Sequence, residues 1–222
     1  MLTYPCRAEK ELWFDFGPAR AGAITQAEFR KHFGHLQFDR VLQYVAFPRV
    51  QLKQQGDAPV VDERCQGRQD MAFFFDWLWG KGVRRIIKVI VDDLGHPPHS
   101  DEAIEKALKP FDVEILDWRR LDLDPVTLET IGKGLREVHL QWSGRNTVLR
   151  SWSEPGGLAN TPTLEMIRIV QTEVLPCPRC LSVLKRVFRL MLTVMTETGP
   201  KLTRADSQKS CRLSRPTIQI MA

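Results

Sequence analysis

The chain has 222 residues, of which 43% are hydrophobic, and it carries a formal net charge of +5 at pH 7. This size fits one domain or one domain with an appendage, and the apolar content is sufficient for a core. Residues 172–222 hold nine Lys/Arg against three Asp/Glu, a net charge of +6, so residues 1–171 carry −1. A near-neutral body argues against a folded nucleic-acid platform, which needs positive charge on the fold itself.

Targeting and redox features indicate an intracellular protein. The first ten residues contain no apolar stretch with a cleavage-type site, so we predict no secretory signal. No uninterrupted run of about 18 apolar residues occurs, so we predict no transmembrane segment. Five scattered cysteines do not indicate a disulfide framework. We therefore predict a reducing, intracellular and cytoplasmic location.

Strands and helices are predicted to alternate along the first 171 residues. Apolar runs predict strands, and capping residues followed by helix-forming segments predict helices. In chain order the sequence predicts a strand at 12–16, a helix to 36, a strand at 41–45, a loop at 51–69, a helix at 70–80, a strand at 85–91, a helix to 109, a strand at 113–117, a helix from 125, a strand at 135–142, a helix at 146–152 and a strand at 164–170.

Three helix starts carry specific capping signals. Thr25 and Glu28 have capping-box spacing, in which the side chain of each residue accepts a hydrogen bond from the backbone N–H of the other. Ser100 and Asp124 are predicted N-caps, and Asp124 is followed by Pro125 at the first helical position. The helix at 70–80 is apolar nearly all round, which predicts burial on most sides.

Four of these strands recur at nearly constant spacing. Their central runs begin at Val89, Val113, Val138 and Ile167, which are 24, 25 and 29 residues apart. A strand-plus-helix unit of 20–29 residues is the period of leucine-rich-repeat-like solenoids, and strands joined by helices form parallel sheets. We predict an α/β fold of repeated βα units arranged as such a solenoid. The alternative is an open, doubly wound α/β layer.

The repeat implies equivalent positions in one core. These positions are Val89, Ile115, Leu140 and Ile169. Glu137, beside them, is expected to be exposed. The rhythm ends near residue 171, which predicts a repeated βα domain at 1–171 and a basic tail at 172–222. We expect the tail to be helical at 181–195, disordered from 199 onward and dispensable for folding, although the strand at Ile167 would then present an open edge.

The segment 92–101 is a candidate metal or hydrolase site. It gathers carboxylates and imidazoles at the C-terminal end of a strand, where α/β sheets place ligands: Asp92, Asp93, His96, His99 and Asp101. Mixed His and Asp ligands suit zinc or iron. The alternative is a polar turn that caps the next helix, because two prolines hold the histidines apart, and we predict no cofactor.

Cysteines and tryptophans supply the other candidates. Cys177 and Cys180 form a CxxC pair, but zinc would need a second pair, and Cys65 has no identifiable base partner. Exposed tryptophans anchor protein interfaces, so a possible interaction surface consists of Trp118, Trp142 and Trp152. The alternative is that these rings fill the core of neighbouring repeats.

Several segments resemble a known family as a set. They are FDFG at 14–17, ITQAEF at 24–29, LQYV at 42–45, KVIVDDL at 88–94, HSDEAIE at 99–105, VEILDW at 113–118, REVHLQWSG at 136–144 and VLRSWSEP at 148–155. Over residues 13–165 the chain resembles the N-terminal, non-catalytic region of fungal intracellular subtilisin-like serine proteases.

The resemblance implies a serine endopeptidase domain further along, and its motifs are missing here. The chain has no Asp-Ser/Thr-Gly, His-Gly-Thr or Gly-Thr-Ser-Met-Ala block. We therefore predict that this chain is not an enzyme and has no catalytic residue. It would be a non-catalytic interaction or regulatory module with an unknown protein partner, from a truncated or shifted reading frame. The alternatives are a hydrolase or metal enzyme using 92–101, and a binding protein that acts through its basic tail.

Overall fold

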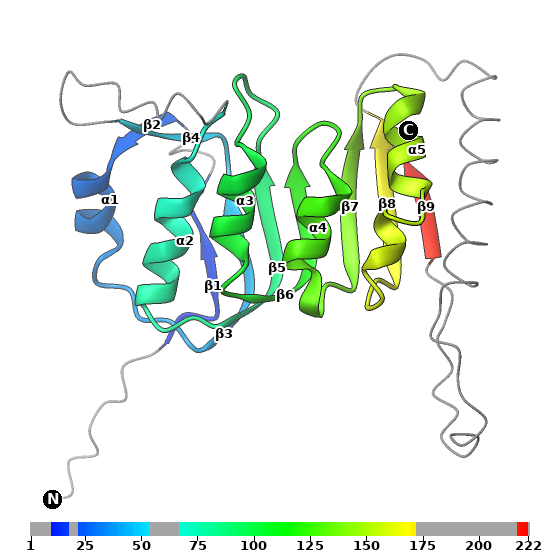
Figure 1. Ribbon diagram of the computed structural model, residues 1–222. Coiled ribbons are helices and arrows are strands. Elements are labelled where there is room, and N and C mark those ends of the chain that lie inside the picture. Colours follow the sequence, from blue (N-terminus) through cyan, green and yellow to red (C-terminus); the bar gives the residue numbers. More distant parts are fainter. Residues whose placement is uncertain (1–9, 18–21, 54–66, 172–216, 222) are drawn as a thin grey trace, which may run out of the picture. The chain divides into compact units, whose positions relative to one another are not determined.

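The computed structural model describes residues 10–17, 22–53, 67–171 and 217–221 (Figure 1). The chain forms two compact units, Met1–Val113 (unit 1) and Glu114–Ala222 (unit 2). Both units combine helices with parallel strands, which confirms the predicted α/β class. In the described part of the chain, every helix falls short of the length and apolar character needed to cross a membrane.

Unit 1 contains two groups of parallel strands. The strands are β1 (Trp13–Asp15), β2 (Gly22–Thr25), β3 (Val41–Phe47), β4 (Val50–Lys53) and β5 (Arg85–Asp92). β3 lies between β1 and β5, whereas β2 pairs with β4. The helices are α1 (Gln26–Phe33), α2 (Asp70–Gly80) and α3 (Asp101–Leu108). The sequence does not predict β2 or β4, because each has only four residues and lacks a distinctive apolar alternation.

The predicted caps of α1 and α3 are confirmed. The Glu28 backbone N–H donates to the Thr25 hydroxyl over 3.2 Å, and the Thr25 N–H donates to the Glu28 carboxylate over 2.9 Å. This backbone hydrogen bond lowers the pKa of Glu28. The Ser100 hydroxyl accepts from the Ala103 N–H over 3.2 Å. Both helices therefore begin where local hydrogen bonding predicts.

An aromatic cluster fills the core of unit 1. It consists of Phe14, Phe16, Phe29, Phe33, Phe47, Phe74 and Trp77. Phe29 is fully buried at its centre, with ring centroids 4.9 Å from those of Phe33, Phe74 and Trp77. The predicted burial of α2 is confirmed in part: five of its eleven residues are buried, whereas Asp76, Trp79 and Gly80 are exposed.

Unit 2 continues the alternation of strands and helices. Its strands are β6 (Asp112–Arg119, which begins at the unit boundary), β7 (Glu137–Trp142), β8 (Met166–Gln171) and β9 (Thr217–Met221). Its helices are α4 (Pro125–Ile131), α5 (Asn146–Ser153), and the 3₁₀ turns η2 (Gly132–Gly134) and η3 (Leu158–Asn160). The predicted Asp124 cap is confirmed, because its carboxylate accepts from the Val126 N–H over 3.1 Å.

The register of unit 2 confirms one part of the predicted core and corrects another. Leu140 lies opposite Ile169, and both are fully buried. Ile115, however, lies opposite Glu137 and is only partly buried, whereas Leu116 takes the buried place opposite Val138. The prediction for Ile115 is wrong by one residue, because two adjacent apolar residues offer no alternation from which to choose a face. In unit 1, Val89 is fully buried opposite Val45.

β9 corrects the prediction for the end of the chain. Residues 199–222 are predicted to lack regular structure, yet Thr217–Met221 pairs in parallel with β8. The short Thr-Ile-Gln-Ile-Met alternation forms a strand only because the edge of β8 completes its hydrogen bonding. The helix predicted at 181–195 lies outside the described residues. The boundary predicted at residue 171 therefore stays a prediction.

Candidate interaction surface

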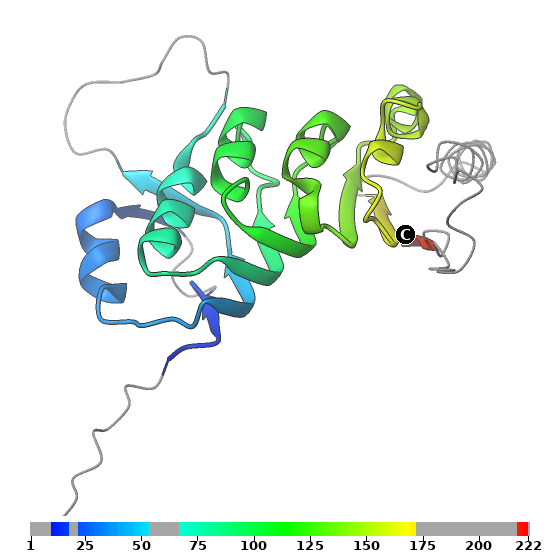
Figure 2. The ribbon, with the colours of Figure 1, turned by 60° about the horizontal axis from the view of Figure 1, so that its bottom comes forward.

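One face of the strands carries no helix in the described part of either unit. In unit 1, α2 and α3 lie on one side of β3 and β5, and in unit 2, α4 and α5 lie on one side of β6, β7 and β8 (Figures 1 and 2). We call the opposite side of each group of strands the helix-free face. Successive residues of a strand point to opposite sides, so alternate residues occupy this face.

In unit 1 an aromatic and cationic row crosses the helix-free face. Trp13 lies opposite Tyr44, which lies opposite Lys88 on the next strand. The Trp13 and Tyr44 rings are nearly parallel, with centroids 6.5 Å apart and planes 8° apart, and Trp13 is 51% exposed. The adjacent row contains Phe14 and Val45, both buried. An exposed tryptophan and a half-buried tyrosine thus lie side by side on strands whose other side is packed.

In unit 2 the helix-free face carries a charged group that we call the sheet-face cluster. Its members are Asp117, Arg119, Glu137, His139 and Arg168. Glu137 Oε1 lies 2.7 Å from His139 Nε2 and 2.6 Å from Arg168 Nε. Asp117 Oδ2 lies 3.8 Å from His139 Nδ1 and 3.2 Å from Arg119 Nη2. Each carboxylate therefore faces a cation or the imidazole.

Glu137 is hydrogen-bonded to two other members of this cluster, His139 and Arg168. Its side chain is only 19% exposed, so the prediction that Glu137 is exposed is wrong. Burial alone would raise the pKa of Glu137, but hydrogen bonds from His139 and Arg168 outweigh it and lower the pKa. The alternation of Val138 and Leu140 with Glu137 and His139 was the only sequence signal for this group, and it does not reveal the partners on β6 and β8.

We expect Glu137→Gln to destabilise the protein in a pH-dependent way. Because the folded-state pKa of Glu137 is lowered, its contribution is complete above the unfolded pKa and is lost as pH falls through the folded value. At pH 7 the variant should lose about 1.5–3 kcal/mol, the typical net contribution of a hydrogen bond to a charged group. The difference from wild type should shrink below about pH 4.5. Urea unfolding at pH 7, 5 and 3 measures this, with the exposed Glu154→Gln as control; equal losses at all three pH values would contradict it.

The candidate site at 92–101 is divided by the fold. Asp93 and His99 form a fully buried pair, with His99 Nδ1 2.7 Å from Asp93 Oδ1 and the His99 backbone N–H donating to the same carboxylate. Asp92 instead approaches Arg49 at 4.0 Å, and His96 is exposed. Asp101 opens α3. No group of three or more His, Cys, Asp or Glu able to hold a metal ion occurs among the described residues.

The prediction of a tryptophan interaction surface is wrong, because the three rings are buried. Trp118 and Trp142 are 0% exposed and Trp152 is 1% exposed, so none is available to a partner. The indole N–H of Trp142 donates to the Arg145 carbonyl over 2.9 Å, and that of Trp152 donates to the Leu123 carbonyl over 2.8 Å. These residues belong to the core, the alternative stated above. The candidates Cys65, Cys177 and Cys180 lie outside the described residues.

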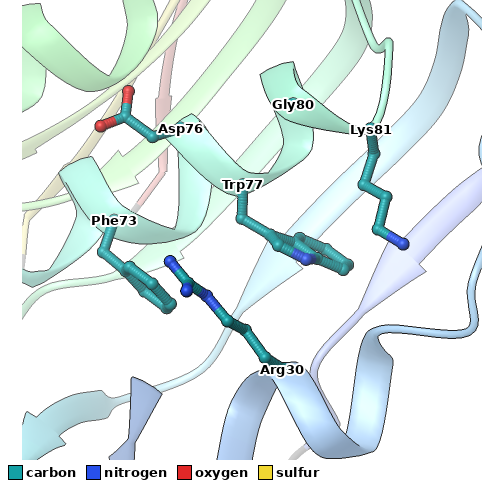
Figure 3. A pocket seen from close by; sticks show the side chains of 6 residues that line it. All are labelled: Arg30, Phe73, Asp76, Trp77, Gly80 and Lys81. Atoms are coloured by element: carbon teal, nitrogen blue, oxygen red, sulfur yellow. The ribbon is translucent and has the colours of Figure 1, made fainter. Parts of the chain in front are cut away.

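A pocket of about 400 Å³ lies between α1 and α2. Figure 3 shows its lining, which is Arg30, Phe73, Asp76, Trp77, Gly80 and Lys81. The Arg30 guanidinium lies 5.5 Å from the centre of the Phe73 ring. The Lys81 ammonium lies 5.6 Å from the centre of the Trp77 ring and donates to the carbonyls of Gly34 and Leu36. Lys81 therefore ties the end of α2 to the segment after α1, which is a structural role.

Comparison with models of known protein families, with curated proteins and with solved structures found no match to this chain.

Proposed function

We propose that this chain is a non-catalytic protein-interaction module that binds a partner through the helix-free face of unit 1. The observation that carries the proposal is the Trp13–Tyr44 pair, in which Trp13 stays 51% exposed and Tyr44 is half-buried although their strands are packed from the other side. Trp and Tyr dominate binding energy at protein interfaces, because a rigid ring buries a large area at a small entropic cost.

The neighbours of this pair suggest the chemistry of the partner. Lys88 continues the row on β5; Leu12, which directly precedes β1, is 45% exposed, and Val41 on β3 is 36% exposed. A partner with an apolar contact surface bordered by acidic side chains would complement this arrangement. The sheet-face cluster of unit 2 supplies a second, charged helix-free face, and we propose that it serves recognition as well.

The arrangement of helices and strands supports a repeat fold, which suits a protein-binding role. Helices on one side of each group of strands favour the predicted leucine-rich-repeat-like solenoid over a doubly wound layer, which places helices on both sides. Solenoids bind proteins along extended faces of this kind. The resemblance to the N-terminal region of fungal subtilisin-like proteases leads us to propose further that the module accompanies or regulates an intracellular protease.

The proposal predicts that binding depends on the aromatic pair. The wild-type chain and the double variant Trp13→Ala/Tyr44→Ala should each be used to capture proteins from a lysate of cells that express this chain. Each captured protein should then be purified. We expect one purified partner to bind wild type with a dissociation constant at least tenfold lower than that for the double variant, since each truncated anchor costs more than about 1 kcal/mol. Titration calorimetry measures both constants.

The matched control is Val126→Ala, which removes an apolar side chain that is 55% exposed on α4. It should bind the partner as wild type does. Equal affinity of wild type and the double variant for every purified partner would contradict the proposal. Casein cleavage that survives repurification and is blocked by a serine-directed phosphonate would contradict the non-catalytic role.

A further inference from the structure

The edge of β8 holds a strand from a distant part of the chain. β9 lies beside β8 in parallel, and residues 172–216 separate the two strands in sequence. The register runs from Met166 opposite Thr217 to Val170 opposite Met221. Without a neighbour, β8 would present a row of unpaired N–H and C=O groups, which is a template for pairing with another strand.

The alternation of β9 matches that of β8 position by position. Ile218 lies opposite Ile167 and Ile220 lies opposite Ile169, and both β8 residues are fully buried. In the register of the sheet, one row runs from Val138 through Ile167 to position 218, and the next runs from Leu140 through Ile169 to position 220. The register therefore selects a segment with aliphatic residues at two alternate positions, because a shift by one residue would exchange the faces.

The position between the two isoleucines holds a polar residue. Gln219 is exposed and lies opposite Arg168 on the helix-free face. Arg168 Nε donates to Glu137, and the other guanidinium N–H groups make no hydrogen bond within the described residues. An acceptor at position 219 can therefore bind Arg168, and a carboxylate there would bind more tightly than an amide.

We propose that the edge of β8 is a strand-binding site that exchanges its occupant, so that Thr217–Met221 of a second copy of this chain can replace β9. The second copy presents the same residues in the same register, and the hydrogen bonds of the pair are identical within one chain and between two. At low concentration the tethered strand has the higher effective concentration and stays bound; at high concentration exchange links two copies. The inference concerns unit 2 alone and is independent of the Trp13 surface.

A labelled peptide covering residues 215–222 tests the site in the full-length chain. Ile218→Pro/Ile220→Pro removes two N–H groups from β9 and should vacate the edge of β8. We expect fluorescence anisotropy to show saturable binding of the peptide to this variant, and binding to wild type at least tenfold weaker because its site is occupied. A peptide with Gln219→Glu should bind several-fold more tightly than the native peptide, and one with Gln219→Lys several-fold more weakly.

Equal binding to both chains, or no binding to a variant that keeps the circular dichroism of wild type, would overturn the proposal. If the double variant does not fold, photo-cross-linking of the chain with p-benzoylphenylalanine in place of Gln219 decides instead. Mixed isotope-labelled and unlabelled copies should then form adducts on peptides containing 166–171, and the share of adducts between copies should rise with protein concentration. The proposal would be overturned if adducts formed only on other peptides, or if they formed only within one copy at every protein concentration.

Discussion

Replacing Leu140 with Asp is expected to unfold unit 2. Leu140 is fully buried on β7 opposite Ile169, which is also fully buried. A carboxylate at this place would lose its water without gaining a partner, at a cost on the order of several kcal/mol. Domains are stable by about 5–15 kcal/mol, so most of the folded population should be lost. Urea unfolding followed by circular dichroism measures the change.

The control for Leu140→Asp must add the same charge at an exposed position of the same unit. Thr147 is exposed in the first turn of α5, where an acidic residue is favourable to the helix dipole. Thr147→Asp should therefore change stability by about half a kcal/mol or less. Glu137 cannot serve as this control, because it is held by His139 and Arg168. Tolerance of Leu140→Asp would show that the observed register of β7 is wrong.

Phe29→Ala should be the most destabilising single truncation in unit 1. Phe29 is fully buried, and its ring contacts those of α2 and of its own helix at centroid distances of 4.9 Å. Deleting a buried phenyl ring removes its transfer free energy and leaves a cavity, at a cost of about 3–5 kcal/mol. The free energy of unfolding in urea should fall by this amount.

Two variants separate the cavity term from other effects. Phe29→Leu keeps much of the volume and should cost clearly less than Phe29→Ala. Trp13→Ala deletes a larger ring, but from a position that is 51% exposed, so we expect a loss of about 1 kcal/mol or less. A loss for Trp13→Ala as large as that for Phe29→Ala would mean that the aromatic pair stabilises the fold and is not a free surface.

Local chemistry explains why much of the secondary structure was predictable. The caps at Thr25, Ser100 and Asp124 depend on residues no more than three positions away, and all three are confirmed. The six strands predicted along residues 12–170 are present as well, because their apolar runs are long and are bounded by turn residues. The strands that were missed are short, and β9 depends on a partner far away in sequence.

The candidate sites were less predictable, since they depend on which residues the fold brings together. The His139 imidazole approaches carboxylates on β6 and on its own strand, and Arg168 approaches from β8. The contact within β7 follows from the alternation of a strand, but no spacing rule along the chain specifies the contacts with β6 and β8, since they depend on the register between strands. The segment 92–101 shows the converse: Asp93 and His99 meet, while Asp92 approaches Arg49 and His96 is exposed.

The sequence by itself determined the α/β class, the order of the predicted strands and helices, and the helix starts, because these follow from interactions between near neighbours. Tertiary structure alone decided burial where the local pattern is ambiguous. It buries Leu116 rather than Ile115, encloses Trp118 and leaves Trp13 exposed. Burial is a property of long-range packing: the same tryptophan is a core residue or a contact residue according to which elements cover it.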